Sequence, residues 1–498
     1  MDTEHISNSN EFLTILIKKG ILVETDVFER IKEMFEKNNT IACLVAKSIC
    51  NDCIGEINLK LINEKISFFE EKNNIDKKGK IIIKKTFKKT RKDYDAQVNI
   101  RKIKENTGKK DISLFCDYFV SRYDKIKKIL MQHLDLTNLV SIGNIKSARG
   151  YSDISIIAIV KDVIEAKTGT IIIDAEDKSG TIRVFAKDPD LCKNIVTDEV
   201  IGITGSSFAG GIIAKKIIFP EIPFPVNVNK IKEPLKAVFI SDIHIGSKEY
   251  LKSIEEKFLK WIEKDKQTEA VKYLFISGDN VDGVGIYPSQ KEDLQIQDIY
   301  DQYSEFESFI EKIPEEIEIM ICPGNHDAVM QFEPQIALDQ EYVPNLMNYS
   351  NVHLVKNPDY AYLHNNDGNN GLKVLMYHGY SFTSIIDAIP ELRKKGLSHP
   401  EHVMTEVLKK RHLAPIYGSS IIAPAKEDNL VIEEIPDIFQ TGDLHSHCLK
   451  SYKGITLISS STFQGQTSFM NKVGHIANPG KVSIVDLHTR EIFVKNFM

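Results

Sequence analysis

Five short apolar runs in the second half of the chain each lead directly into a cluster of Asp, His or Asn residues. The runs are bounded by Gly, Pro or Asp, and they span Ala237–Ile240, Tyr273–Ile276, Ile319–Cys322, Val374–Met376 and Ile438–Gln440. Apolar runs of this length suit strands that are buried on both faces. In a layered α/β fold, side chains at the carboxyl ends of neighbouring strands converge on one crevice. The sequence therefore predicts that these scattered clusters meet in space.

The residues that follow the runs are candidate ligands for two divalent metal ions. They are Asp242 and His244 in FISDIHIG, Asp279 in FISGDN, Asn325 and His326 in PGNHD, His378 in YHGYS, and Asp443, His445 and His447 in TGDLHSH. Paired cations offset the repulsion between a phosphodiester and an incoming anion, ionise a water and stabilise the departing oxygen. Imidazoles mixed with carboxylates and an amide suit Mn²⁺ or another borderline divalent ion.

The order of these motifs resembles the signature of the calcineurin-like metallophosphoesterases. That signature reads Asp-x-His, Gly-Asp, Gly-Asn-His-Asp, His-Gly and finally His-x-His. The resemblance implies that Asp242 and His244 bind the first metal. It also implies that Asp279 bridges the two ions and that Asn325 and His378 bind the second.

The resemblance gives His326 a different role from its neighbours. It implies that His326 is not a ligand but protonates the leaving alkoxide or polarises the phosphate. An imidazole suits this task because its pKa lies near neutrality.

The last motif departs from the family pattern, which usually reads Gly-His-x-His. Aligning its glycine with Gly442 puts Asp443 at the first histidine position and His445 at the second. A two-residue slip would pair His445 with His447 instead, since all three side chains point to the same face of an extended segment. We favour the first alignment and keep His447 in reserve. A carboxylate in place of an imidazole favours a harder ion such as Mn²⁺ over zinc.

Longer segments resemble the small subunits of archaeal family-D DNA polymerases. They read GDNVDGVGIYPSQKEDLQIQDIYDQYSEF, IPEEIEIMICPGNHDAVMQFEPQ and ISSSTFQGQTSFMNKVGHIANPGKVSIVDL, with ENTGKKDISLFCDYFVSRYDKIKKIL upstream. The resemblance runs from about residue 97 to the C-terminus. It implies a 3′→5′ proofreading exonuclease with two Mn²⁺ ions, acting on DNA beside a large catalytic polymerase subunit. A sliding clamp and other replication proteins are further expected partners.

Two other functions are compatible with parts of the sequence. The phosphoesterase domain of a silent scaffold subunit would have lost catalysis, as in the eukaryotic relatives, but such a loss should erase the ligand motifs, and they are present here. A stand-alone repair nuclease or phosphoesterase would not need the long N-terminal regions. The exonuclease subunit is therefore the favoured hypothesis.

The N-terminal part of the chain divides into three segments. Residues 1–70 carry apolar residues at helical spacing and predict a small helical domain. Residues 71–110 form a basic flexible linker, because KKGKIIIKKTFKKTRK contains no acidic residue and like charges repel. This linker is either a solvated tether or a DNA contact. Residues 111–136 hold an amphipathic helix around Phe115–Leu130.

Two larger domains complete a multidomain α/β plus all-β chain. Residues 137–225 contain five β-branched segments separated by turns, which predict an OB-fold barrel. Its main strand aromatics are Phe185, Phe208 and Phe219, and a structural or subunit-docking barrel is favoured over direct DNA binding. Residues 235–498 predict a calcineurin-like α/β sandwich phosphoesterase domain, with helices over Tyr250–Lys264 and Asp298–Lys312.

Composition limits the partners of the chain. The net charge of −6 gives no global field for nucleic acid, so DNA binding needs local basic patches or a partner. One Cys-x-x-Cys pair, Cys50 and Cys53, lacks the second pair of a zinc site and predicts reduced structural thiols. The acidic, polar start and the lack of a long apolar stretch predict a cytoplasmic protein without a membrane segment.

Overall fold

The computed structural model divides into two compact units, Met1–Lys88 with Pro344–Tyr349, and Lys89–Val343 with Ser350–Met498. The residues described are 12, 14–16, 25–37, 42, 45–46, 96–101, 112–147, 152–208, 211–224, 228–364, 371–423 and 425–498. Cys50, Cys53 and the lysine-rich residues 77–92 lie outside them. No helix in these ranges is both long and apolar enough to span a membrane.

The first unit is helical in its described residues, as the apolar spacing predicts. Helix α2 (Thr25–Lys37) buries Val27, Ile31 and Met34 along one face. Phe12 and Phe35 are also buried, and their ring centres lie 6.3 Å apart. The 3₁₀ turn η4 (Leu346–Asn348) is part of the same unit.

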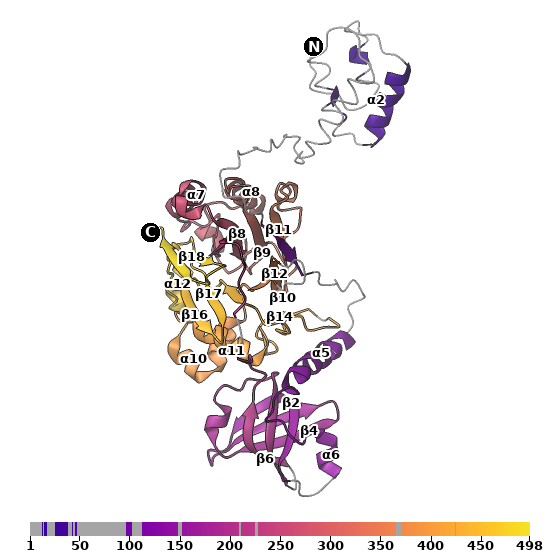
Figure 1. Ribbon diagram of the computed structural model, residues 1–498, viewed down its shortest axis with the longest axis vertical. Helices are drawn as coiled ribbons and strands as arrows, with labels where there is room; N and C mark the ends of the chain where they lie inside the picture. Colours follow the sequence, from indigo (N-terminus) through magenta and orange to yellow (C-terminus); the bar gives the residue numbers. More distant parts are fainter. Residues whose placement is uncertain are drawn as a thin grey trace. The chain divides into compact units, whose positions relative to one another are not determined.

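A closed five-stranded barrel forms the N-terminal part of the second unit (Figure 1). Its strands are β2 (Ile154–Glu165), β3 (Ile171–Asp177), β4 (Gly180–Ala186), β5 (Val200–Phe208) and β6 (Gly211–Ile218), in the order β2-β3-β4-β6-β5. Only the β4–β6 pair among these is parallel. Short helices α6 (Ile142–Ser147) and η1 (Pro189–Cys192) flank it. The five strands coincide with the five predicted β-branched segments.

Helix α5 (Ser113–Leu130) packs on the outside of the barrel. Tyr123, Ile126 and Leu130 join Ile157 and Val200 in one apolar cluster. The amphipathic helix is therefore present where its periodicity predicts it, and its apolar face covers the barrel.

Two six-stranded sheets build the C-terminal domain. The first has the order β11-β9-β8-β7-β18-β19, with β7 (Lys236–Ile240), β8 (Val271–Ser277), β9 (Glu318–Cys322), β11 (Val352–Leu354), β18 (Lys481–Asp486) and β19 (Ile492–Asn496). The second has the order β1-β12-β13-β15-β17-β16, with β1 (Val98–Ile100), β12 (Asp359–Leu363), β13 (Leu372–Met376), β15 (Ile438–Thr441), β16 (Cys448–Tyr452) and β17 (Ile455–Ser459). A separate pair joins β10 (Phe332–Glu333) to β14 (Ile421–Ile422).

Strand β1 departs from the sequence expectation. Residues 98–100 fall within the predicted basic flexible linker, yet they pair antiparallel with β12 at the edge of the second sheet. Val98 and Ile100 pack against the core between the sheets, and the backbone N–H of Gln97 donates to the hydroxyl of Tyr273. The partner strand lies far along the chain, so the pairing could not be predicted from the charge of the segment around β1.

The core of this domain lies between the sheets. Phe239 and Phe275 of the first sheet stack at 5.0 Å and share a cluster with Val374, Ile438 and Ile458 of the second. The central strands of each sheet run parallel: β7, β8 and β9 in one, β13, β15 and β17 in the other. This arrangement brings the predicted ligand motifs to the strand ends of both sheets.

Helices cover the outer faces of the two sheets (Figure 1). They are α7 (Lys252–Lys264), α8 (Ile299–Glu311), α9 (Phe382–Ala388), α10 (Pro390–Lys395) and α11 (Pro400–Lys410). Helix α12 (Ser468–Val473) and the short turns η2 (Lys266–Thr268) and η3 (Gln290–Asp293) lie in the connections between these elements and the strands, or between two strands. The ring centres of Phe258 in α7 and Phe309 in α8 lie 6.1 Å apart. The predicted helices over Tyr250–Lys264 and Asp298–Lys312 correspond to α7 and α8.

A buried ionic network joins α5 to the C-terminal domain. Asp428 accepts hydrogen bonds from Arg122 Nε at 2.7 Å and from His412 Nε2 at 2.8 Å, and all three residues are buried. Nearby, the ammonium of Lys410 contacts Glu199 of the barrel at 2.8 Å, again with both side chains buried. Removing one partner of such a network would leave a buried charge without its counter-charge, which is strongly destabilising.

Candidate metal centre

The backbone turns sharply at the positions that carry the candidate ligands. Five of these residues have positive φ angles between 46° and 65°: Asp242, His244, Asp279, Asp443 and His445. They follow the ends of strands β7, β8 and β15. A left-handed conformation is costly for residues other than glycine and is found mainly where function requires it. The turns keep these side chains beside the strand ends.

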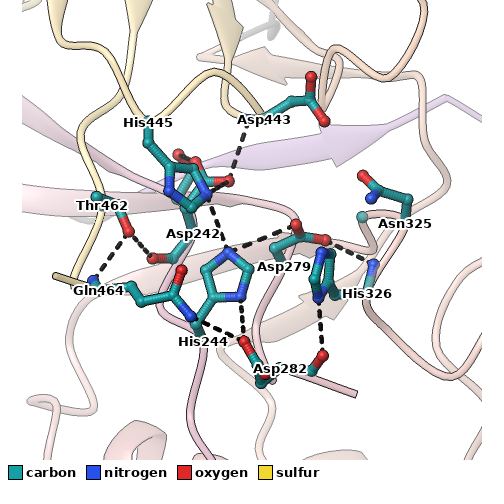
Figure 2. Close-up of polar contacts among 12 residues, drawn as sticks. Asp242, His244, Asp279, Asp282, Asn325, His326, Asp443, His445, Thr462 and Gln464 are labelled. Atoms are coloured by element: carbon teal, nitrogen blue, oxygen red, sulfur yellow. Dashed lines mark hydrogen bonds and ion pairs between the residues drawn. The ribbon is translucent and has the colours of Figure 1, made fainter. Parts of the chain in front are cut away.

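One group of four side chains surrounds a single point. The Nε2 atoms of His244 and His445 lie 3.0 Å apart. Asp242 Oδ1 is 3.4 Å from His445 Nε2, and Asp279 Oδ2 is 3.6 Å from His244 Nε2. Figure 2 shows His244 standing between His445 and Asp282, with Asp279 beside it. Two nitrogens and two carboxylate oxygens thus face one another.

A second group shares Asp279 with the first. Its Oδ2 atom is 3.3 Å from His378 Nε2, which is also 3.9 Å from Asp443 Oδ1. Asn325 Oδ1 is buried and has no hydrogen-bond partner among the described residues. Asp279 Oδ2 therefore lies within 3.6 Å of a histidine nitrogen of each group, which suits the bridging role implied for it.

The donor set fits two divalent cations. His378 Nδ1 donates to the carbonyl of Ser277 at 2.8 Å, which leaves Nε2 as a buried lone pair without a hydrogen-bond partner in the described structure. Likewise, His244 Nδ1 faces Asp282 at 2.9 Å, so its Nε2 lone pair points at His445. A cation satisfies such converging lone pairs, and a carboxylate behind a ligating histidine is a common support.

Glycines make room for these ligands. A Cβ atom added to Gly324 would lie 2.2 Å from Asp279 Oδ1 and 2.7 Å from His378 Nε2. At Gly278, where φ is +86°, a Cβ atom would lie 2.3 Å from His378 Nδ1. The glycines of the Gly-Asp and Gly-Asn-His-Asp motifs therefore permit the close approach of strand ends and ligands.

The electrostatics of the group favour added positive charge. Burial raises the pKa of Asp443 to about 6, with His378 opposing the shift and Asp279 and Asp242 adding to it. Burial also acts to raise the pKa of Asp279, but His378, His326 and His244 outweigh it and hold that pKa well below its usual range. Three carboxyl groups crowd together here, and two cations would neutralise them.

His326 is positioned differently from the ligand side chains. Its Nδ1 atom donates to the carbonyl of Asp282 at 2.8 Å, and its backbone N–H donates to Asp279 Oδ1 at 2.8 Å. The side chain is half-buried, whereas His244 and His378 are buried. The carbonyl fixes the tautomer, so Nε2 is the nitrogen left to exchange a proton with a substrate.

The structure does not bring His447 to either group. Its Nε2 atom hydrogen-bonds the hydroxyl of Ser483 at 2.9 Å, and burial lowers its pKa to about 4. The expectation that Asp443, His445 and His447 share one face fails because the segment between β15 and β16 is not extended: Asp443 and His445 have left-handed backbones. The geometry agrees with the first alignment of the motif.

We predict that His445→Ala and His447→Ala differ in their effect on Mn²⁺ affinity. The first variant should weaken Mn²⁺ binding by more than about 100-fold, beyond what loss of a supporting residue costs. The second should leave Mn²⁺ affinity within about twofold, because His447 contacts Ser483 rather than the ligands. Isothermal titration with Mn²⁺ measures both. Equal losses in the two variants would contradict the assignment of His445.

Three residues that support the candidate ligands were not predicted from the sequence. Asp282 contacts His244 and receives a hydrogen bond from Gln464 Nε2 at 2.9 Å. Asp327 is buried and accepts hydrogen bonds from Tyr303, Asn280 and the backbone of Gly324. The spacing of Asp282, three residues after Asp279, was a usable signal. Gln464 offered none, since it reaches the centre from a distant loop.

Comparisons with known proteins identify sequence relatives of this chain. The B-subunit family of DNA polymerases alpha and epsilon matches residues 237–450. A DNA polymerase II small subunit of Archaeoglobus fulgidus is 39% identical over 78% of this chain and 78% of its own length. The DNA polymerase II small subunit of Methanothermobacter thermautotrophicus is 33% identical over 96% of this chain and 98% of its own.

One solved structure that the chain resembles is more distant in sequence. A structure described as a novel archaeal phosphodiesterase has 13% identity and a TM-score of 0.27, over 53% of this chain and 99% of its own. The sequence relatives carry the assignment, because their identity exceeds 30% over most of both chains. The chain belongs to the family of archaeal family-D DNA polymerase small subunits, also called DNA polymerase II small subunits.

Proposed function

We propose that this chain is the 3′→5′ exonuclease subunit of a two-subunit DNA polymerase and hydrolyses the terminal phosphodiester of a DNA strand. One observation carries the proposal: buried carboxylates and imidazoles from both sheets converge on Asp279, with ligand atoms 3.0 to 3.9 Å apart. The names of its relatives support a large polymerase subunit as partner. DNA, a sliding clamp and a cytoplasmic location belong to the same proposal.

The residues that would hold two Mn²⁺ ions divide around Asp279. Asp242, His244 and His445 would complete one site, and Asn325 and His378, with Asp443, the other. When bound, the ions would offset the charge of the phosphate oxygens. They would also lower the pKa of a water, so that hydroxide is available to attack phosphorus. Mixed nitrogen and oxygen donors with several carboxylates favour Mn²⁺ over zinc.

His326 would act as the general acid that protonates the leaving group. As the bond from water oxygen to phosphorus forms, the bond from phosphorus to the 3′ oxygen breaks. His326 Nε2 gives its proton to that oxygen and regains one from solvent. The hydrogen bond from Nδ1 to the carbonyl of Asp282 keeps the ring oriented through both steps. The attacking water loses its own proton to solvent.

A silent scaffold is the second candidate, and the ligand set argues against it. A domain that only supports a large subunit has no need of buried, unpartnered nitrogen and oxygen atoms such as His378 Nε2 and Asn325 Oδ1. Keeping polar atoms buried without partners destabilises a fold. A stand-alone nuclease is disfavoured because it would not need α5 and the barrel, which buried ion pairs join to the C-terminal domain.

We predict that His326→Ala lowers the release of nucleotides from a 5′-labelled primer by about 10²–10⁴-fold, the usual contribution of a general acid. Mn²⁺ affinity should stay near the wild-type value, because His326 is no ligand in this account. Asp242→Ala should abolish both release and binding at its site.

The assay compares wild type and both variants, in complex with the large subunit, on mismatched and matched primers with Mn²⁺, Mg²⁺ and Zn²⁺. Wild-type protein that releases no nucleotide with any metal would refute the exonuclease. Full activity in Asp242→Ala would show that the assigned centre is not the site of hydrolysis.

A further inference from the structure

Two stacked aromatic rings stand beside the candidate centre and have no role in the proposed hydrolysis. The rings of Tyr287 and Phe469 lie 5.2 Å apart with an angle of 22° between their planes. The ring of Tyr287 is in turn 6.4 Å from the ring of His326. That distance is about two base-stacking steps of ~3.4 Å each.

Asp293 joins the two loops that carry these rings. Its carboxylate accepts a hydrogen bond from the hydroxyl of Tyr287 at 3.1 Å and from that of Ser468 at 3.3 Å. Ser468 directly precedes Phe469 at the start of helix α12. The stacked pair is therefore held in place by a shared acceptor as well as by ring contact.

The loop around α12 is also tied to the metal centre. Gln464 Nε2 donates to Asp282 at 2.9 Å, and the backbone N–H of Asn478 donates to the carbonyl of His445 at 3.0 Å. Both ends of the segment that bears Phe469 are thus anchored at ligands or their supports. The ring is preorganised beside the centre.

The Phe469 side of this platform is partly exposed to solvent. Tyr287 covers one face of Phe469, yet the residue is 45% exposed. Val284 and Ile476 are exposed on the same loops, at 46% and 69%, and Met330 is 62% exposed on the loop that follows His326. Exposed apolar side chains on loops that also carry buried charged residues are compatible with a ligand that has both an apolar and an anionic part.

We infer that Tyr287 and Phe469 form a stacking platform for the unpaired terminal base of a single-stranded 3′ end, and that this platform selects frayed or mismatched ends for hydrolysis. The inference rests on the proposed function. Every base has a π face, so stacking is tolerant of sequence, and it contributes about 1–3 kcal/mol per base. A base must leave its pair to reach Phe469, and this unpairing costs least for a frayed or mismatched end.

The position of the rings favours a nucleobase over a protein segment as the occupant. The Tyr287 ring of the pair lies 6.4 Å from the ring of His326, and a partner segment seated there has no chemical link to the group on which that imidazole would act. A terminal base, in contrast, is joined to the phosphate on which His326 would act. Occupancy by the large subunit is kept as an outcome of the test.

The first test measures stacking without hydrolysis. The full chain carrying His326→Ala, in complex with the large subunit, is titrated into an oligonucleotide with 2-aminopurine as its 3′-terminal base. Stacking on the rings should quench the fluorescence of that base. Phe469→Ala should remove the quenching, and Phe469→Tyr should restore it. Phe493→Ala is the matched control, since Phe493 is 47% exposed on β19 at the edge of the first sheet.

The second test measures selectivity. In a chain that keeps His326, Phe469→Ala should lower kcat/KM for single-stranded and mismatched 3′ ends about tenfold or more. A strand whose terminal nucleotide is abasic should lose the same factor in wild type, and Phe469→Ala should add no further loss on it. Phe469→Tyr should retain wild-type values.

The outcomes separate this inference from the proposed function. If no protein releases nucleotides but quenching by the His326→Ala protein depends on Phe469, the platform stands and the exonuclease fails. If wild type hydrolyses DNA while Phe469→Ala changes neither quenching nor selectivity, the platform is refuted and the exonuclease stands. Loss of large-subunit binding in Phe469→Ala, with quenching unchanged, would show that the rings contact protein.

Discussion

Asp279→Asn is expected to abolish the stabilisation of this chain by Mn²⁺. Asp279 Oδ2 lies 3.3 Å from His378 Nε2 and 3.6 Å from His244 Nε2, so its carboxylate would contribute to both metal sites. Replacing one oxygen by an amide nitrogen removes the charge that both ions share and presents N–H groups to them. A ligand at 100 times its Kd stabilises a protein by about 2.7 kcal/mol, and the variant should gain almost none of it.

The measurement is thermal or chemical unfolding of wild type and Asp279→Asn with and without Mn²⁺. Asp298→Asn serves as the matched control, because Asp298 caps helix α8 and Asn caps helices about equally well. The control should keep the full stabilisation by the metal. A variant at position 279 that gains as much stability from Mn²⁺ as wild type would contradict the shared-ligand account.

Asp428→Asn is expected to cost about 3–5 kcal/mol of folding free energy, as breaking a buried ion pair usually does. Asp428 accepts hydrogen bonds from Arg122 and His412, and all three side chains are buried between α5 and the C-terminal domain. An amide would leave the Arg122 guanidinium without a buried counter-charge. Urea unfolding measures the loss as a lower midpoint.

The exposed pair Arg183 and Asp174 supplies the control. It has a similar contact, 3.2 Å, but its side chains are 66% and 36% exposed. Asp174→Asn should change stability by less than about 1 kcal/mol. Equal effects at positions 174 and 428 would show that the buried network does not hold the domains together.

The same network makes stability dependent on pH. Burial, together with Arg122, lowers the pKa of His412 to about 4, whereas in the unfolded chain it is about 6.5. Between those values the unfolded state binds a proton that the folded state does not, so stability should fall as pH drops from about 6.5 to about 4. Burial alone would raise the pKa of Asp428, but His412 and Arg122 hold it well below its usual range, so a further loss is expected in stronger acid. Urea midpoints across this range provide the test, and a flat profile would contradict it.

Sequence predicted the parts of this fold that are encoded locally. The runs before Asp242, Asp279 and His378 form strands, as predicted. Each run is apolar, has the length of a strand and is too short for a typical helix. The parallel order of those strands then explains why the motifs meet. The barrel followed from β-branched segments separated by turns.

Contacts between distant segments were not predictable in this way. Arg122 and Asp428 are separated by 306 residues, and nothing in either segment indicates the other. Strand β1 was hidden in a basic stretch because its partner, β12, lies far along the chain. The placement of His447 depended on two left-handed residues before it, and a pattern of alternation assumes an extended backbone.

The central claim is that segments from both sheets assemble a centre for two cations around Asp279. Anomalous diffraction from crystals of the chain soaked in Mn²⁺ tests it most directly. The account predicts two peaks, one among Asp242, His244 and His445, the other between His378 and Asn325, with Asp279 contacting both. Absence of both peaks, or manganese bound only away from Asp279, would contradict it.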